Sequence, residues 1–284
     1  MTVYLHVGPH KTGTTAVQRA MSRNAGLVYP AVKRLGPGHA LLAWQSIGSP
    51  QRPAEPDLLL DVVRAQLRAD APLVLSSEEF STSIMPGRSA EALVRLADTF
   101  PVELIVTLTP AVERAVSMAQ EVVKHGQPVD FHDEAAMRAI VRDRPGLQPD
   151  LPERLMGLAN WRAVHFVLAD RSRRDRLFEI FSAILGVPIR HDPDDRMYLN
   201  SRYCYAEMAI LSALNRISPG SGLVELRTAA RQALLAARAS LPDIAAVDYP
   251  PLPHPLAREL DQLWGDQLQR MEAWDAAGTA RLHR

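Results

Sequence analysis

The 284-residue sequence lacks several features, and each absence argues against a class of protein. The single cysteine, Cys204, excludes intrachain disulfides and multi-cysteine metal sites. Lysine plus arginine equals aspartate plus glutamate at 32 each, so no excess of positive charge indicates a nucleic-acid partner. No apolar run approaches a membrane-spanning length, and no basic region followed by an apolar stretch opens the chain. We therefore expect a cytoplasmic protein with neither a membrane nor a nucleic-acid partner.

Lysine is also scarce, with three in the whole chain, and one of them lies in the most informative segment. An apolar strand pattern over Val3–Val7 leads into Gly8-Pro-His-Lys-Thr-Gly-Thr-Thr15, and a helical pattern follows from Ala16. Backbone N–H groups at the start of a helix have no intrahelical partner, and the helix dipole favours negative charge there. The segment therefore predicts a phosphate cradle that contains Lys11.

The spacing within this segment separates two kinds of phosphate loop. Gly8 and Gly13 keep the glycine spacing of a nucleotide-hydrolysing P-loop, and Thr15 fills its last position. That loop requires lysine directly after the second glycine, where this chain has Thr14. Because the lysine stands inside the turn, at Lys11, the usual lysine contact with the β- and γ-phosphates of ATP is absent.

Gly8-Pro-His-Lys-Thr-Gly-Thr-Thr15 resembles the 5′-phosphosulfate loop of the sulfotransferases, most of all that of the bacterial branch. The resemblance implies that the donor is 3′-phosphoadenosine-5′-phosphosulfate (PAPS), which leaves as 3′-phosphoadenosine-5′-phosphate (PAP). It implies that Lys11 stabilises the departing phosphate and that no metal is required. The residues expected to bind the donor here are Pro9, His10, Lys11, Thr12, Gly13, Thr14 and Thr15.

Short apolar strands alternate with amphipathic helices along the chain, a pattern that predicts an α/β protein with a doubly wound parallel sheet. After Val3–Val7, the expected strands are 72–77, 102–108 and 163–168, and the expected helices are 57–68, 90–99, 151–159, 173–185, 203–216, 223–240 and 255–274. We expect one sulfotransferase-like domain over 1–284, with a core of about 2–216 and a helical C-terminal extension over 217–284. Ligands of such sheets bind beyond the carboxyl ends of the strands.

The second strand ends in Ser76–Ser81, which carries two adjacent carboxylates. A carboxylate beside an apolar pocket can accept a proton from the nucleophile of a transfer reaction. The segment also resembles the Ser-Ser-Glu-Glu-Phe run of bacterial sulfotransferases. Neighbouring strand residues point to opposite sides, so one of Glu78 and Glu79 faces the site, and we favour Glu78. His39 is an alternative base, at a position where the bacterial family often has a histidine near the acceptor.

The segment 104–126 corresponds to the family's 3′-phosphate region. Ser117 matches the serine of that region, but Thr109 stands where the family has arginine. The difference matters because arginine binds phosphate with a two-pronged charged group, whereas threonine offers one hydroxyl. The resemblance makes Thr109 and Ser117 the expected contacts of the 3′-phosphate. Three other basic residues are candidates to replace the missing arginine: Arg114, Lys124 and Arg202.

We therefore expect a PAPS-dependent sulfotransferase that acts on a hydroxyl or amine of a small molecule or glycan. One alternative is a sulfotransferase-like binding protein with impaired catalysis, suggested by Thr109. A second alternative is a nucleotide kinase, with Thr15 on Mg²⁺ and Asp170 as the second metal-binding carboxylate. Thr14 in the lysine position argues against the kinase.

Overall fold

The computed structural model of the protein describes most of the chain. The described residues are 2–9, 14–49, 51–68, 70–142, 148, 150–169, 174–190, 205–217, 225, 228–230, 232–234, 236 and 252–284. The chain divides into two compact units, and each is described by itself below. The first comprises Met1–Thr109, Gln148–Leu199 and Trp264–Arg284, and the second comprises Pro110–Leu147 and Asn200–Leu263. Within the described residues, none of the helices combines the length and the hydropathy needed to span a membrane.

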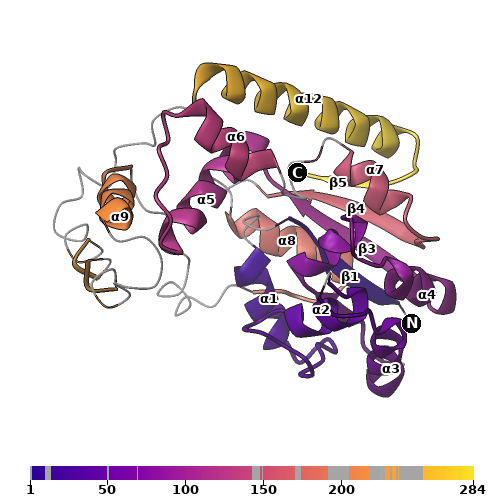
Figure 1. The fold of residues 1–284 in the computed structure, drawn as a ribbon. Helices are drawn as coiled ribbons and strands as arrows, with labels where there is room; N and C mark the ends of the chain where they lie inside the picture. Colours follow the sequence, from indigo (N-terminus) through magenta and orange to yellow (C-terminus); the bar gives the residue numbers. More distant parts are fainter. Residues whose placement is uncertain are drawn as a thin grey trace. The chain divides into compact units, whose positions relative to one another are not determined.

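The first unit contains a five-stranded, all-parallel sheet with the order β2-β1-β3-β4-β5 (Figure 1). The strands are β1 (Val3–Val7), β2 (Leu73–Ser76), β3 (Val102–Leu108), β4 (Ala163–Leu168) and β5 (Arg281–His283). Val3 of β1 pairs with Leu73 on one side and with Val102 on the other. The parallel α/β sheet expected from the sequence is therefore confirmed, and β3 and β4 have the expected bounds.

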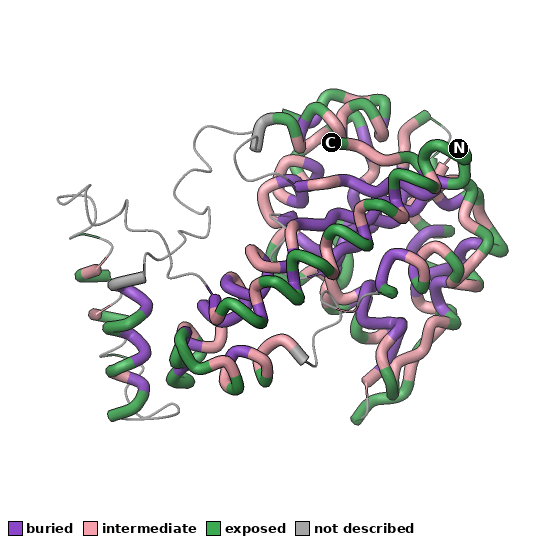
Figure 2. The backbone as a smooth tube through the Cα atoms, turned by 90° about the horizontal axis from the view of Figure 1, so that it is seen from above, coloured by how far each residue is buried: buried purple, intermediate pink, exposed green. Residues whose placement is uncertain are grey.

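Both faces of the sheet are covered, because alternate strand residues belong to two different apolar clusters. Tyr4, Val74 and Ile105 pack with α1 (Thr14–Ser22) and α8 (Arg174–Leu185). Their neighbours Leu5, Leu75 and Leu104 belong to the other cluster. That cluster includes residues of α2 (Ala40–Ile47), α3 (Pro56–Gln66), α4 (Glu91–Thr99), α7 (Leu151–Met156) and Met271. Figure 2 shows the result as buried backbone along the strands and exposed residues on the outer sides of the helices.

The strand β5 corrects one expectation from the sequence, which predicts a helical extension outside the core over 217–284. Within that range α12 (His254–Ala276) is helical as expected. After α12, however, Gly278 adopts a φ of 70° and turns the chain, and Leu282 then pairs with Phe166 of β4. The turn needs glycine because a side chain strains a backbone with positive φ. A three-residue strand carries no periodic pattern, so sequence patterns do not reveal it.

The second unit is helical among its described residues. It contains α5 (Ala111–Lys124), α6 (Glu134–Arg142), α9 (Tyr205–Ile217) and the first residues of α12. Polar side chains of α9 tie it to the end of α5 and the following loop. The Ser212 hydroxyl accepts from Val129 N–H at 2.9 Å and donates to its carbonyl at 2.8 Å. The Asn215 amide donates to the carbonyls of Val123 at 2.8 Å and Gln127 at 3.0 Å.

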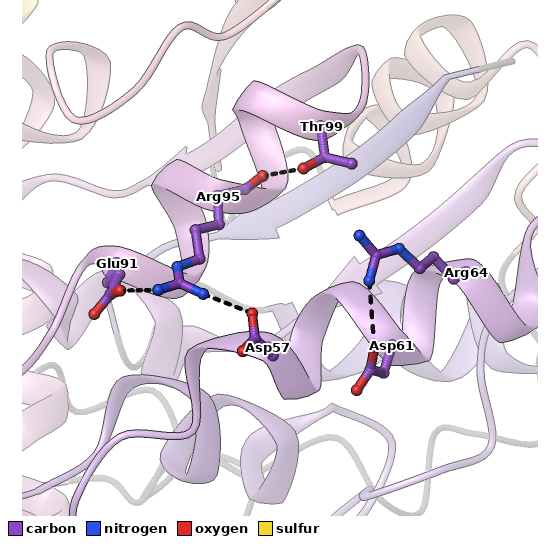
Figure 3. A network of polar contacts seen from close by, with 6 residues as sticks. All are labelled: Asp57, Asp61, Arg64, Glu91, Arg95 and Thr99. Atoms are coloured by element: carbon purple, nitrogen blue, oxygen red, sulfur yellow. Dashed lines mark hydrogen bonds and ion pairs between the residues drawn. The ribbon is translucent and has the colours of Figure 1, made fainter.

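Polar contacts on the surface link α3 to α4 in the first unit (Figure 3). Arg95 of α4 donates to Asp57 of α3 at 2.7 Å and also to Glu91 one turn earlier. All three side chains are largely exposed, so water and salt screen the attraction between them. The apolar clusters on the two faces of the sheet must therefore supply most of the stability of this unit.

This contrast predicts very different effects for two truncations. Phe166 of β4 is 0% exposed and stacks on Trp274 with the ring centroids 5.6 Å apart. Phe166→Ala should lower the free energy of unfolding by about 3–5 kcal/mol through loss of burial and an unfilled cavity. Arg95→Ala should produce no resolvable change. Urea unfolding followed by circular dichroism measures both, and comparable losses in the two variants would contradict the assignment of stability to the apolar clusters.

Candidate functional site

The candidate site lies at the carboxyl ends of β1, β2 and β3. In the order β2-β1-β3, the next strand along the chain, β2, lies on one side of β1 and the one after it, β3, lies on the other. Open α/β sheets bind ligands in the crevice at such a switch point. Gly8 directly follows β1 and lies close to β3: a Cβ added there would be 2.6 Å from the Thr107 carbonyl oxygen. The close contact between the two strand ends thus requires a residue without a side chain at position 8.

The anion loop itself is described only at its two ends. His10, Lys11, Thr12 and Gly13 lie outside the described residues. Before them, Gly8 and Pro9 are buried at the end of β1, and after them α1 begins at Thr14, whose side chain is also buried. The strand end and helix start that an anion loop needs are thus where the sequence predicts them.

Glu78 lies against the start of α1. It is the first residue of η1 (Glu78–Ile84), a 3₁₀ helix capped by Ser77, whose hydroxyl accepts from the Glu79 N–H at 3.1 Å. The Glu78 carboxylate accepts hydrogen bonds from the Thr14 hydroxyl and from the Gln18 side-chain amide, the latter at 3.4 Å. Of the two adjacent carboxylates, Glu78 is therefore the one whose described contacts are with the first two turns of α1.

A buried polar chain leads from the middle of the sheet to this carboxylate. The ring of His6 in β1 lies between the Ser76 hydroxyl at 2.7 Å and the Thr107 hydroxyl at 2.9 Å, so it bridges β2 and β3. The Gln18 amide group that contacts Glu78 also donates to Ser76 Oγ at 3.1 Å. Neither His6 nor Gln18 is among the site residues expected from the sequence. The available signal was a histidine in an otherwise apolar strand, which requires polar partners once it is buried.

His39 holds the end of β2 and does not face an open site. It is 0% exposed, and its backbone N–H donates to the Ser76 carbonyl at 2.8 Å. The ring Nδ1 accepts from the Ser76 N–H at 3.1 Å, so the proton is on Nε2, which donates to the Pro30 carbonyl at 2.8 Å. Because both ring nitrogens are bonded to the backbone, the base role expected for His39 does not fit this geometry. The structure supports a positioning role instead.

Thr109 and Ser117 occupy different units. Thr109 comes directly after β3, is 1% exposed, and its hydroxyl has no hydrogen-bond partner among the described residues. Ser117 lies on α5 in the second unit and is half-buried. Their joint contact with a 3′-phosphate stays a prediction. Arg202 and Asp170 lie outside the described part of the chain.

Comparison with known proteins yields a similar solved structure. No family model matches the sequence, and no curated protein matches it. The chain is similar to the crystal structure of a sulfotransferase from Alicyclobacillus acidocaldarius, with 20% sequence identity and a TM-score of 0.45. The similarity covers 75% of this chain and 95% of the other. A likeness at this level specifies neither the reaction nor its substrates.

The two buried histidines predict that acid destabilises the protein. Burial lowers the pKa of His6 and of His39 from 6.5 to about 4, because a charged imidazole loses its hydration inside the protein. In the unfolded chain both take up a proton near their ordinary pKa, whereas the folded protein does not do so until about pH 4. The free energy of unfolding therefore has its full value, as far as these two histidines are concerned, above about pH 7. It decreases as the pH falls from 6.5 toward 4, because the unfolded chain then binds protons that the folded protein does not.

We expect the free energy of unfolding to fall by about 2 kcal/mol per buried histidine between pH 7.5 and pH 5. Urea unfolding at a series of pH values measures this slope. His39→Gln should reduce the slope, because it removes one of these two buried histidines. If the variant keeps the full slope, His39 is not one of the groups responsible.

Proposed function

We propose that this protein is a sulfotransferase that moves a sulfuryl group from PAPS to a hydroxyl or amine of a small molecule or glycan. The observation that carries the proposal is the contact between Glu78 and Thr14. It brings a carboxylate from the end of β2 against Thr14, where the anion loop passes into α1. A group able to accept a proton thus adjoins a group able to bind phosphate, which is the pairing that sulfuryl transfer to a hydroxyl requires.

The described residues fit a phosphate-containing donor at the loop. Thr14 is buried at the first residue of α1, where helix N–H groups have no intrahelical partner, so hydroxyl and amide donors lie together. In the proposed site, Pro9 to Thr15 surround the 5′-phosphate, and amides and hydroxyls of the threonines donate to it. Lys11 supplies positive charge to the bridging oxygen as the bond between sulfur and that oxygen breaks.

Glu78 takes the proton of the acceptor in this proposal. As the acceptor oxygen or nitrogen forms its bond to sulfur, its proton passes to the Glu78 carboxylate and PAP departs. The partners of Glu78 among the described residues, the Thr14 hydroxyl and the Gln18 amide, are neutral donors, so they orient the carboxylate without cancelling its charge. A phosphate in the loop competes for the Thr14 hydroxyl, and Gln18 then keeps Glu78 in place.

Ligand binding separates this proposal from its rivals. PAP should raise the melting temperature without any divalent metal, because binding to the folded state stabilises it by about 2.7 kcal/mol at a ligand concentration 100 times Kd. ATP with Mg²⁺ should have a smaller effect. Differential scanning fluorimetry makes the comparison. Stabilisation by ATP with Mg²⁺ and not by PAP favours a kinase, and stabilisation by PAP without turnover of PAPS favours a binding protein.

Glu78→Gln tests the proton acceptor, and Glu79→Gln is the matched control on the next residue. We expect Glu78→Gln to lower turnover by roughly 10²–10⁴-fold, the usual contribution of a positioned base. Its affinity for PAP should be unchanged or tighter, because a negative charge has been removed beside the phosphate. Release of PAP from PAPS with phenol, alcohol and amine acceptors measures turnover, and calorimetry measures affinity. Equal losses of turnover in both variants would rule out a specific role for Glu78.

A further inference from the structure

A chain of hydrogen bonds within the first unit joins Glu78 to the middle of the sheet. Its members are Glu78, Gln18, Ser76, His6 and Thr107. The last four are between 0% and 3% exposed, so their polar atoms depend on one another and not on bulk water. The chemistry of the groups at each step determines which of them donates the hydrogen.

The carboxylate sets the direction at one end of the chain. An ionised carboxylate only accepts hydrogen bonds, so the nitrogen of the Gln18 amide, and not its oxygen, faces Glu78 Oε2 at 3.4 Å. The same nitrogen carries a second hydrogen, which it donates to Ser76 Oγ at 3.1 Å. A Cβ added to Gly38 would lie 3.1 Å from both the nitrogen and the oxygen of this amide, so the amide lies against backbone and has little room to turn over.

Ser76 passes this direction on to His6. The Ser76 oxygen accepts from Gln18, and its own hydrogen remains to be donated; His6 Nδ1 lies 2.7 Å away. Donation to Nδ1 places the ring proton on Nε2, which then donates to the Thr107 hydroxyl at 2.9 Å. Burial lowers the pKa of His6 to about 4, so near neutral pH the ring has one donor and one acceptor, as this arrangement requires.

Tyr29 is another polar neighbour of Ser76. Its hydroxyl donates to the Pro37 carbonyl at 2.9 Å and also interacts with Ser76. If Ser76 donated to Tyr29 instead of His6, the ring proton would be on Nδ1. Hydrogen bonds donated by a hydroxyl are typically shorter than those donated by N–H. The 2.7 Å at Nδ1 and the 2.9 Å at Nε2 therefore fit a hydroxyl donor at the first nitrogen and an N–H donor at the second.

We propose that His6, as the Nε2–H tautomer, is a positioning residue for Glu78. It accepts the Ser76 hydrogen, which leaves the Ser76 oxygen to accept from Gln18, and Gln18 directs its other hydrogen to the carboxylate. The chain thereby holds one oxygen of Glu78 while a ligand competes for the Thr14 hydroxyl on the other. The role of Glu78 as a base rests on the proposed function; the direction of the hydrogen bonds does not.

NMR can read the tautomer of His6 without any substrate. Long-range nitrogen–proton correlation spectra near neutral pH distinguish a protonated ring nitrogen from an unprotonated one, and through-bond assignment identifies the signals of His6. We expect the proton on Nε2. A ring protonated at Nδ1, or an equal mixture of the two tautomers, means that Ser76 does not donate to His6 and overturns the proposal.

Glu78→Gln tests whether the carboxylate imposes this direction. An amide at this position can accept or donate, so Gln18 is no longer held with its nitrogen forward, and the His6 signals should move toward a mixture of tautomers. Glu79→Gln is the matched control and should leave them in place. In a Gln18→Met background, which removes the link, Glu78→Gln should no longer alter the His6 tautomer.

Two results of this comparison contradict the chain. An unchanged His6 spectrum in Glu78→Gln shows that the carboxylate does not set the direction. An equal response with and without Gln18 shows that the charge of Glu78 acts on His6 through space.

Turnover tests the positioning role. Ser76→Ala breaks the chain with little change of volume, and Ser46→Ala is the control, because Ser46 is also 0% exposed and its hydroxyl has no hydrogen-bond partner among the described residues. We expect Ser76→Ala to lower kcat roughly 2- to 10-fold, the range for one neutral hydrogen bond, with unchanged affinity for PAP. Should Ser76→Ala fail to fold, Thr107→Val, which removes the acceptor of His6 Nε2, takes its place with the same expected result.

The two kinds of measurement separate this inference from the proposed function. An Nε2-protonated His6 in a protein that neither binds PAP nor turns over PAPS supports the hydrogen-bonded chain and refutes the proposed function. Turnover of PAPS that falls no further in Ser76→Ala than in Ser46→Ala refutes the positioning role and leaves the proposed function standing.

Discussion

The close contact between the ends of β1 and β3 is the constraint on which the candidate site depends. At Gly8 the backbone lies so close to the Thr107 carbonyl that a side chain has no room. The first residue after β1 is therefore still in contact with β3. The His6 ring crosses from Thr107 to Ser76 just before this point and joins the ends of all three strands. The same strand ends carry the contact between Glu78, which follows β2, and Thr14 at the start of α1.

Acidic and basic residues are balanced in number over the whole chain, but Glu78 and Arg114 have no partner of opposite charge among their described contacts. Acidic and basic residues number 32 each, and exposed pairs such as Arg95 with Asp57 account for part of that balance. The Glu78 carboxylate, by contrast, receives hydrogen bonds from a hydroxyl and an amide, and the Arg114 guanidinium receives no partner at all among the described residues. For Arg114, burial lowers the pKa to about 9, and ionisable groups with perturbed pKa values are enriched at functional sites.

Features that depend on local patterns could be predicted from the sequence. The apolar runs of β3 and β4 indicate both strands correctly, and the glycine-bounded motif correctly places the start of α1 after β1. Burial of polar groups is harder to predict, because it depends on contacts between distant segments. The sequence suggests His39 as a base at an open site, yet its ring is bonded to Pro30 and Ser76 in the interior. Arg114 shows the same limit: nothing in its local sequence distinguishes a buried arginine from an exposed one.

The pairing of β4 with β5 has a consequence for how the chain folds. His165 of β4 pairs with Arg281, more than a hundred residues later in the sequence. During synthesis β1 to β4 emerge first, so one side of β4 offers unpaired backbone N–H and C=O groups until the far segment arrives. An exposed strand edge can pair with another chain and start aggregation. The short strand β5 therefore covers this edge of β4 late, and until it docks the edge can pair with another nascent chain.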